Sequence, residues 1–165
     1  AYPALIQRKA DSAGLAVRVE NAGLSGETSA GALRRVDWLL RGPVDVLVLE
    51  TGANDGLRGL DVDTTRHNIE RIIARVRSLR PNARVFLVQM EAPPNLGTKY
   101  TGEFRAMFPE VARATGATLL PFLLEGVAGE PSLNQPDGIH PNEEGARRVA
   151  ANVWRGLAPA LTGSP

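Results

Sequence analysis

Residues that could carry out acyl-transfer chemistry are grouped most clearly in Asp137-Gly138-Ile139-His140-Pro141, where an acid precedes a histidine by three residues. At this spacing the carboxylate of Asp137 can reach the near ring nitrogen of His140. The far ring nitrogen is then free to act as a base, as in a Ser-His-Asp site. The alternative is a surface pair near the start of a helix, and the motif alone does not decide between the two.

Two glycine-containing loops supply candidate hydrogen-bond donors. Gly26, in Leu24-Ser25-Gly26-Glu27-Thr28, allows a backbone N–H to point outward beside a ligand, although a positive-φ turn explains this glycine equally well. Asn54, in Gly52-Ala53-Asn54-Asp55-Gly56, has a side-chain amide that could donate to a developing oxyanion. An asparagine in a tight turn is the alternative, and we expect Asp55 to cap the turn that follows it.

Composition narrows the class of protein. The 165 residues are enough for one domain with a substantial core, and 43% hydrophobic and 22% charged residues are ordinary for a globular chain. A net charge of +1 gives no basic surface for nucleic acid or for membranes. The absence of cysteine excludes disulfides, thiolate metal sites and a cysteine nucleophile. No apolar run approaches the roughly 18 residues that a membrane-spanning helix needs, so no stable membrane insertion is expected.

Apolar periodicity predicts helices and strands in regular alternation. Helices are expected at residues 2–12, 30–40, 63–79, 103–115 and 142–157, and strands at residues 15–19, 44–50, 84–89 and 118–122. Pro109 should kink or split the fourth of these helices. Such alternation is typical of an α/β fold in which a parallel sheet lies between two layers of helices, a three-layer α/β/α sandwich.

Sites in open parallel sheets form beyond the carboxyl ends of the strands. Four loops leave the predicted strands at that edge, at residues 21–29, 51–60, 90–102 and 123–140. We therefore expect Asp137 and His140 to share an edge of the sheet with Gly26 and Asn54. On the third of these loops, the apolar side chains either wall an acyl pocket or form an ordinary rigid loop; they are Met90, Pro93, Pro94 and Leu96.

Three ordered blocks of this sequence resemble a known family. Residues 21–28, 52–55 and 137–141 resemble the second, third and fifth conserved blocks of the SGNH (GDSL-type) hydrolases. The likeness is strongest to the bacterial thioesterase/arylesterase/lysophospholipase branch, which Gly56-Leu57-Arg58-Gly59 and Pro93-Pro94-Asn95 also resemble.

The resemblance implies a role for each candidate residue. His140 would be the general base, oriented by Asp137, while the Gly26 N–H and the Asn54 side chain would form the oxyanion hole. It also implies a flavodoxin-like sheet, small acyl ester or thioester substrates of short to medium chain length, and no metal or cofactor. The residues expected to contact substrate are Leu57, Met90, Pro93 and Pro94. Because the branch is often exported, a periplasmic or secreted location is expected, with a cytoplasmic one as the alternative.

One block of the family pattern is absent, the Gly-Asp-Ser that carries the nucleophile at the end of the first strand. We expect it upstream of Ala1, which makes residues 1–165 a single but N-terminally incomplete SGNH domain. In the strand order 2-1-3-4-5, this gap would leave unpaired edges at residues 15–19 and 44–50, so a separate segment or chain is expected to supply the strand. Ser25 is a poor substitute nucleophile, and the other serines are placed worse: Ser12, Ser29, Ser78, Ser132 and Ser164.

A second class of function is a catalytically inactive fragment or a degenerate binding module of the same fold, since no nucleophile is placed. A phosphorylation-controlled receiver domain needs a lysine after the last strand, and none follows Lys99. A nucleotide-dependent enzyme is excluded because no phosphate-cradling glycine motif follows a strand.

Overall fold

The computed structural model describes residues 1–163. Their contacts divide the chain into two compact units. The sheet unit is Leu24–Leu120, and the terminal unit combines Ala1–Gly23 with Pro121–Pro165. The single domain over residues 1–165 stays a prediction.

The sheet unit is built on a three-stranded parallel sheet in the order β1-β2-β3. Its strands are β1 (Val46–Leu49), β2 (Arg84–Val88) and β3 (Thr118–Leu120). Phe86 lies opposite Val48 on one side and Thr118 on the other, and β2 is buried from Val85 onward because it has a neighbour on each side. The parallel sheet and these three strands confirm the prediction. Within the described residues, β1 has a strand partner along one edge only.

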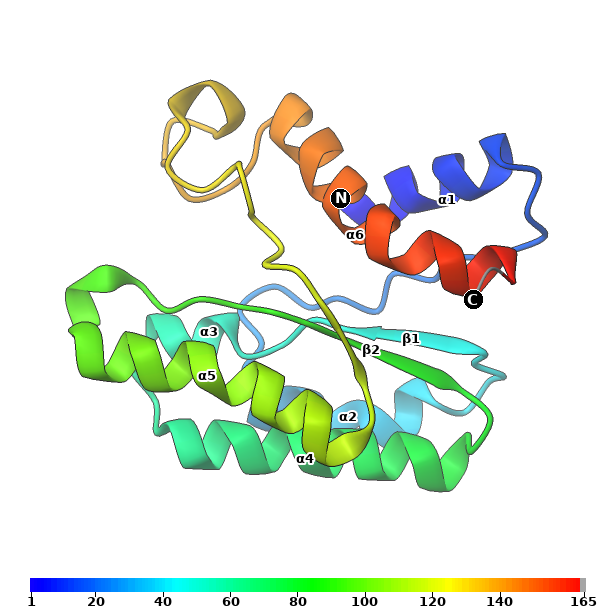
Figure 1. The fold of residues 1–165 in the computed structure, drawn as a ribbon, viewed down its shortest axis with the longest axis horizontal. Helices are drawn as coiled ribbons and strands as arrows, with labels where there is room; N and C mark the ends of the chain where they lie inside the picture. The colour runs from blue at the N-terminus through cyan, green and yellow to red at the C-terminus, as the bar shows by residue number, and fades with distance from the viewer. Residues whose placement is uncertain (164–165) are drawn as a thin grey trace. The chain divides into compact units, whose positions relative to one another are not determined.

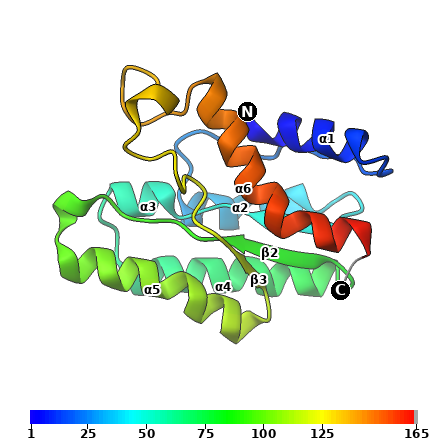
Figure 2. The same cartoon turned by 45° about the horizontal axis from the view of Figure 1, so that its top comes forward.

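Helices α2, α4 and α5 lie together on one face of this sheet (Figures 1 and 2). The helical segments of the sheet unit are α2 (Ser29–Leu39), α3 (Ala53–Leu57), α4 (Val62–Leu79), η1 (Pro94–Leu96) and α5 (Thr98–Thr115). Thr28 caps α2 by accepting a hydrogen bond from the Gly31 N–H. The apolar stripes of α4 and α5 are fully buried and form the core with β2. The core residues include Ile69, Ile73 and Val76 of α4, Phe104 and Phe108 of α5, and Leu87 of β2.

The terminal unit pairs the first helix with the last. α1 (Tyr2–Ser12) packs against α6 (Glu143–Thr162), and a short turn of helix, η2 (Pro131–Leu133), precedes α6. The residues buried in this unit include Ile6, Ala10, Val149, Ala150 and Val153. Within residues 1–163, no helix combines the length and apolar character that crossing a membrane requires.

The predicted strand at residues 15–19 is wrong. This segment forms no ladder and belongs to no strand. Its backbone instead bonds to one side chain of α1, because the Gln7 amide donates to the Val17 carbonyl and accepts from the Val19 N–H, at 2.8 and 2.7 Å. Alternating apolar residues satisfy the pattern of a strand, but pairing requires a neighbour, and an amide side chain supplies only two of the bonds.

Several predicted boundaries also move. α5 begins at Thr98 rather than 103, after Gly97 at φ +90°, and runs through Pro109 without being split. α6 continues past 157 and ends at Gly163, whose left-handed φ of +71° closes the helix. The short helix α3 lies where the sequence predicted only a loop.

Candidate active site

The terminal unit brings Asp137 and His140 into direct contact, as predicted. His140 Nδ1 lies 2.6 Å from Asp137 Oδ2. The other carboxylate oxygen, Oδ1, accepts from the backbone N–H groups of Ile139 and His140, at 2.9 and 3.0 Å. The carboxylate therefore binds both the ring and the backbone of the histidine, which fixes the direction of the imidazole.

The loop that carries this pair is closed on itself. Asn134 and Pro141 form an antiparallel bridge, and the Gln135 N–H donates to the His140 carbonyl at 2.7 Å. Gly138, at φ +69°, provides the left-handed turn inside the loop. Asn142 then caps α6 by accepting from the Gly145 N–H at 3.0 Å. The chain therefore leaves His140 directly into a rigid helix.

The electrostatics of the pair favour one proton arrangement. The hydrogen bond from the His140 side chain, with further bonds from the backbone of His140 and Ile139, lowers the pKa of Asp137 from 3.8 to about 2. An ionised carboxylate can only accept, so Nδ1 must carry the proton and Nε2 of the neutral ring has a free lone pair. The His140 side chain is 69% exposed, and Nε2 has no partner within residues 1–163. This nitrogen can take a proton from a nucleophile.

In the sheet unit, the loop that carries Gly26 is tied to the short helix α3, which carries Asn54. Asn54 Nδ2 donates to the Glu27 carbonyl at 2.9 Å, and Arg58 Nη2 donates to the Gly26 carbonyl at 3.2 Å. Gly26 is exposed with φ +76°, and among the described residues nothing accepts from its N–H. Since one N–H of the Asn54 amide is used by Glu27, the other stays available for a ligand.

The prediction that Asp55 caps the turn after it is wrong. Asp55 is buried, and its side chain accepts from both the backbone N–H and the hydroxyl of Ser29, each at 2.7 Å. The carboxylate therefore caps the first turn of α2. No local pattern indicates this contact, because the two residues are 26 positions apart.

The residues expected to contact substrate differ in exposure. Leu57 is 57% exposed, while Met90 is only 5% exposed and lies in the core. Pro93 is half-buried and Pro94, at the start of η1, is exposed. Their contact with an acyl chain stays a prediction.

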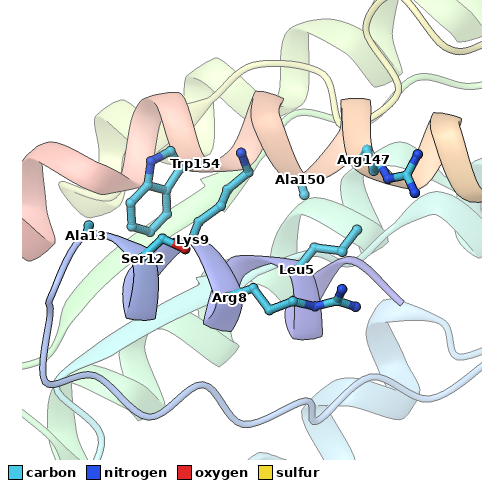
Figure 3. A pocket seen from close by; sticks show the side chains of 8 residues that line it. All are labelled: Leu5, Arg8, Lys9, Ser12, Ala13, Arg147, Ala150 and Trp154. Carbon is cyan, nitrogen blue, oxygen red and sulfur yellow. The ribbon is translucent and has the colours of Figure 1, made fainter.

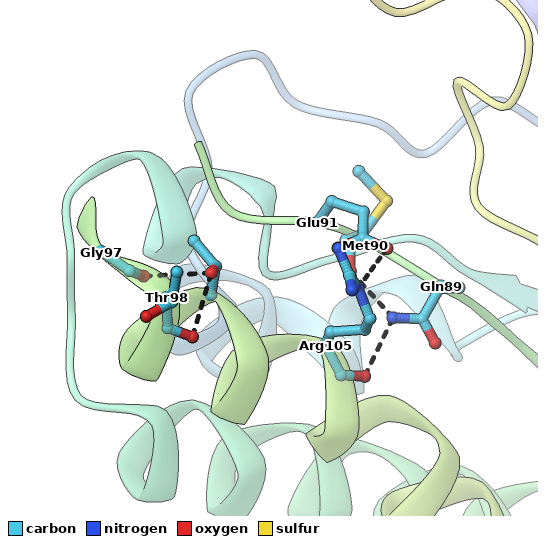
Figure 4. A network of polar contacts seen from close by, with 7 residues as sticks. Gln89, Met90, Glu91, Gly97, Thr98 and Arg105 are labelled. Atoms are coloured by element: carbon cyan, nitrogen blue, oxygen red, sulfur yellow. Dashed lines mark hydrogen bonds and ion pairs between the residues drawn. The ribbon is translucent and has the colours of Figure 1, made fainter. Parts of the chain in front are cut away.

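The loop after β2 is held against α5 by polar contacts (Figure 4). Gln89 Nε2 donates to the Met90 and Arg105 carbonyls at 2.9 and 3.1 Å, and Arg105 pairs with Glu91 at 2.9 Å. The Thr101 hydroxyl bonds the Gly97 carbonyl at 3.0 Å. These bonds restrain both ends of the segment that holds Met90, Pro93 and Pro94.

The terminal unit also has a groove between α1 and α6, with a volume of about 580 Å³. Figure 3 shows its lining, which is Leu5, Arg8, Lys9, Ser12, Ala13, Arg147, Ala150 and Trp154. None of the predicted site residues lines it. A second groove, of about 420 Å³, is lined in part by Gln135, Pro141 and Asn142. These three residues belong to the loop that carries Asp137 and His140.

Within residues 1–163, no three His, Cys, Asp or Glu side chains gather as metal ligands would. Among the serines of residues 1–163, no hydroxyl bonds a histidine ring, and Ser29 is fully buried in its contact with Asp55. Ser25 is exposed in the Gly26 loop, and Ser164 lies outside the described residues.

Comparison with known proteins identifies the family. The sequence model of the GDSL-like lipase/acylhydrolase family matches residues 1–148. The chain belongs to this family. Esterase TesA of Pseudomonas aeruginosa is 39% identical over 161 residues, which cover 97% of this chain and 79% of that protein. Thioesterase 1/protease 1/lysophospholipase L1 of Escherichia coli K12 is 38% identical over 163 residues, covering 98% and 76%.

A solved structure of an esterase supports the fold. EstA from Pseudoalteromonas sp., inhibited by monoethylphosphonate, superimposes with a TM-score of 0.89 at 34% identity, covering 96% of this chain and 86% of that one. The predicted α/β fold class and the resemblance to SGNH hydrolases are thus confirmed. The roles of the individual residues in this GDSL-like chain stay predictions.

Proposed function

We propose that this GDSL-like chain hydrolyses carboxylic esters or thioesters of short to medium acyl chain length. The observation that carries the proposal is the contact of 2.6 Å between Asp137 Oδ2 and His140 Nδ1, with Nε2 left free on an exposed ring. Relatives that are named an esterase and a thioesterase/lysophospholipase support this substrate class.

In the proposed mechanism, a serine hydroxyl attacks the acyl carbonyl carbon while His140 Nε2 takes its proton. The negative charge that develops on the carbonyl oxygen accepts hydrogen bonds from the Gly26 N–H and the Asn54 amide. The C–O or C–S bond then breaks, and the leaving group takes the proton from His140. Water, deprotonated by the same nitrogen, then attacks the acyl-serine. The serine oxygen leaves, takes that proton back from His140, and the acid is released. Asp137 stays ionised throughout and stabilises the imidazolium.

The nucleophile is proposed to come from a strand that pairs with the open edge of β1. This edge, Val46-Leu47-Val48-Leu49, carries no charge or proline that would protect it from pairing. A parallel neighbour would end at the same side of the sheet as β1, where Asn54 follows. Slow amide hydrogen exchange along the outer edge of β1 in full-length protein would support this strand, and rapid exchange there would argue against it.

An active-site probe tests the whole proposal. Full-length protein is incubated with a fluorophosphonate, which reacts with activated serines, and the labelled peptide is identified by mass spectrometry. The phosphonate inhibition of EstA makes this chemistry a suitable choice. We expect one labelled serine in wild type, and strongly reduced labelling and ester turnover in His140→Ala, with His67→Ala, an exposed histidine within α4, as the matched control.

The alternative is a degenerate binding module of the same fold. It would give no labelled serine and no hydrolysis of either p-nitrophenyl butyrate or a short acyl-CoA thioester. Labelling that is unchanged in His140→Ala would instead remove His140 from the base role.

A further inference from the structure

A buried polar cluster joins the two segments that carry the proposed oxyanion-hole donors, Gly26 and Asn54. Asp55, which is 2% exposed, accepts from the Ser29 N–H, the Ser29 hydroxyl and the Thr65 hydroxyl, at 2.7, 2.7 and 3.2 Å. Asn68 Nδ2 donates to the Ser29 hydroxyl at 3.1 Å. All of these residues belong to the sheet unit.

The cluster is costly to distort. A carboxylate removed from water must have its charge compensated by hydrogen bonds, and such charge-assisted bonds are about twice as strong as neutral ones. The Ser29 hydroxyl uses its one hydrogen on Asp55 and also accepts from Asn68. A shift of Ser29 away from Asp55 would leave buried polar groups unpaired, so the two residues hold a fixed separation.

The position of the cluster in the chain links it to the proposed donors. Ser29 follows Gly26 by three residues, and Asp55 is the neighbour of Asn54. Three side chains of α3 and its C-cap therefore hold the segment that begins with Gly26: Asn54 bonds the Glu27 carbonyl, Asp55 bonds Ser29, and Arg58 bonds the Gly26 carbonyl. Of these three contacts, only the one made by the Asp55 carboxylate is buried.

We propose that Asp55 and Ser29 are positioning residues that fix the Gly26 N–H relative to the Asn54 amide. Neither side chain touches substrate, and the inference rests on the proposed function of Gly26 and Asn54 as oxyanion donors. A transition-state oxyanion needs both donors within hydrogen-bond distance at once, and a displacement on the order of 1 Å can cost about a hundredfold in rate.

Thr65 provides the matched control. Its hydroxyl lies 3.2 Å from the same carboxylate and 3.0 Å from the Asp61 carbonyl, and it is as deeply buried as Ser29, but it comes from α4 and has no bond to the loop of Gly26. Ser29→Ala removes a hydroxyl donor from Asp55, and Thr65→Val removes the hydroxyl that Asp55 shares with the Asp61 carbonyl. Only the first of them loosens the tie between the two loops.

The experiment measures kcat and KM for p-nitrophenyl butyrate in full-length protein, at a temperature where both variants are folded by circular dichroism. We expect Ser29→Ala to lower kcat by about tenfold or more with KM changed little, because the lost interaction acts in the transition state. Thr65→Val should stay within about twofold of wild type, since the geometry of the donors is kept. Equal losses in the two variants would overturn the inference and leave only a stability role for the cluster.

A double-mutant cycle adds a test that a merely structural role would not pass. If Ser29 acts through the position of the donors, Ser29→Ala should cost little further activity in an Asn54→Ala background. Additive losses would contradict the proposal. If Ser29→Ala does not fold, Asp55→Asn, which keeps the side-chain shape and removes the charge, enters the same comparison. An inactive wild type would refute the proposed function instead, which separates the two failures.

Discussion

Gly145, in the first turn of α6, leaves no room for a side chain, and this makes the packing beside His140 testable. A Cβ at this position would lie 2.0 Å from the carbonyl oxygen of Leu133 and 3.0 Å from Cβ of Pro141. The same Leu133 carbonyl accepts from the Asn142 N–H at 2.9 Å, which closes the loop that holds Asp137 and His140. Gly145→Ala therefore pushes on the main chain that closes this loop.

The loss of stability in Gly145→Ala depends on whether the atoms near the new Cβ can move away. Real Cβ atoms essentially never come within 3.0 Å of another atom, and here the contact is a main-chain oxygen that no rotamer can withdraw. Overpacking costs about 1–3 kcal/mol and occasionally more, and a rigid backbone contact belongs at the upper end. Alanine gains about 1 kcal/mol over glycine in helix propensity. The net loss of stability is therefore about 2 kcal/mol, or about 4–8 °C in Tm for a domain of this size.

Gly102→Ala is the matched control, because it makes the same chemical change in a helix where nothing lies within 4 Å of the new Cβ. This variant should gain stability, by up to about 1 kcal/mol. The assay is thermal and urea unfolding of full-length wild type and both variants, followed by ester turnover well below each Tm. We expect Gly145→Ala also to lower kcat, because the loop of His140 must shift to relieve the contact.

Opposite signs for the two glycine variants are the decisive result. If Gly145→Ala melted at or above the temperature of wild type, the close approach of α6 to Leu133 would be wrong. A destabilised Gly145→Ala with unchanged kcat would mean that the loop of His140 adjusts independently of α6.

Two further predictions concern the donors and the pH dependence. Asn54→Ala should lower kcat by about a hundredfold or more, the usual cost of an oxyanion-hole donor, and turnover equal to wild type would exclude Asn54 from that role. Ester turnover should fall as the pH is lowered, because the base must be neutral, and a flat pH–rate profile would argue against His140. Asp137 is not the cause of that fall, since its pKa is lowered to about 2. A lowered carboxylate pKa stabilises the folded state above pH 3.8, and this contribution is lost as the pH falls from 3.8 to about 2. In urea unfolding, Asp137→Asn should therefore be less stable than wild type at pH 6, and the difference should narrow below pH 3.8.

Much of the fold could be predicted because its signals are local. The apolar runs of β1, β2 and β3 and the stripe of α4 appear directly in the sequence, and the structure forms all four. Residues 15–19 show the limit of such signals. Their alternation fits a strand, but their backbone bonds the side chain of Gln7, the Ala10 carbonyl and a carbonyl within the segment, and no strand. Periodicity reports which faces of a segment are apolar, whereas a strand also needs a neighbour.

In the candidate site, too, contacts between residues close in sequence could be predicted, and contacts between distant residues could not. The contact between Asp137 and His140 spans three residues and includes two backbone bonds inside the same turn, so the spacing alone was enough to predict it. The bonds that tie Asn54, Asp55 and Arg58 to the segment at residues 26–29 span 26 to 32 residues, and the sequence does not predict them. Asp55 was assigned to the nearest turn because sequence reasoning offers a carboxylate only its neighbours as partners.

The two halves of the proposed machinery thus differ in how the chain specifies them. The base and its acid are adjacent in sequence, and a closed loop with a helix cap is enough to orient them. The oxyanion donors come from separate loops, so their relative position depends on a buried carboxylate and the hydroxyl it binds. Substitutions that weaken the base should therefore lie in the loop at residues 134–142 or at positions packed directly against the chain that closes it, as Gly145 is. Substitutions that weaken the oxyanion hole should extend inward to Ser29 and Asp55, which no substrate reaches.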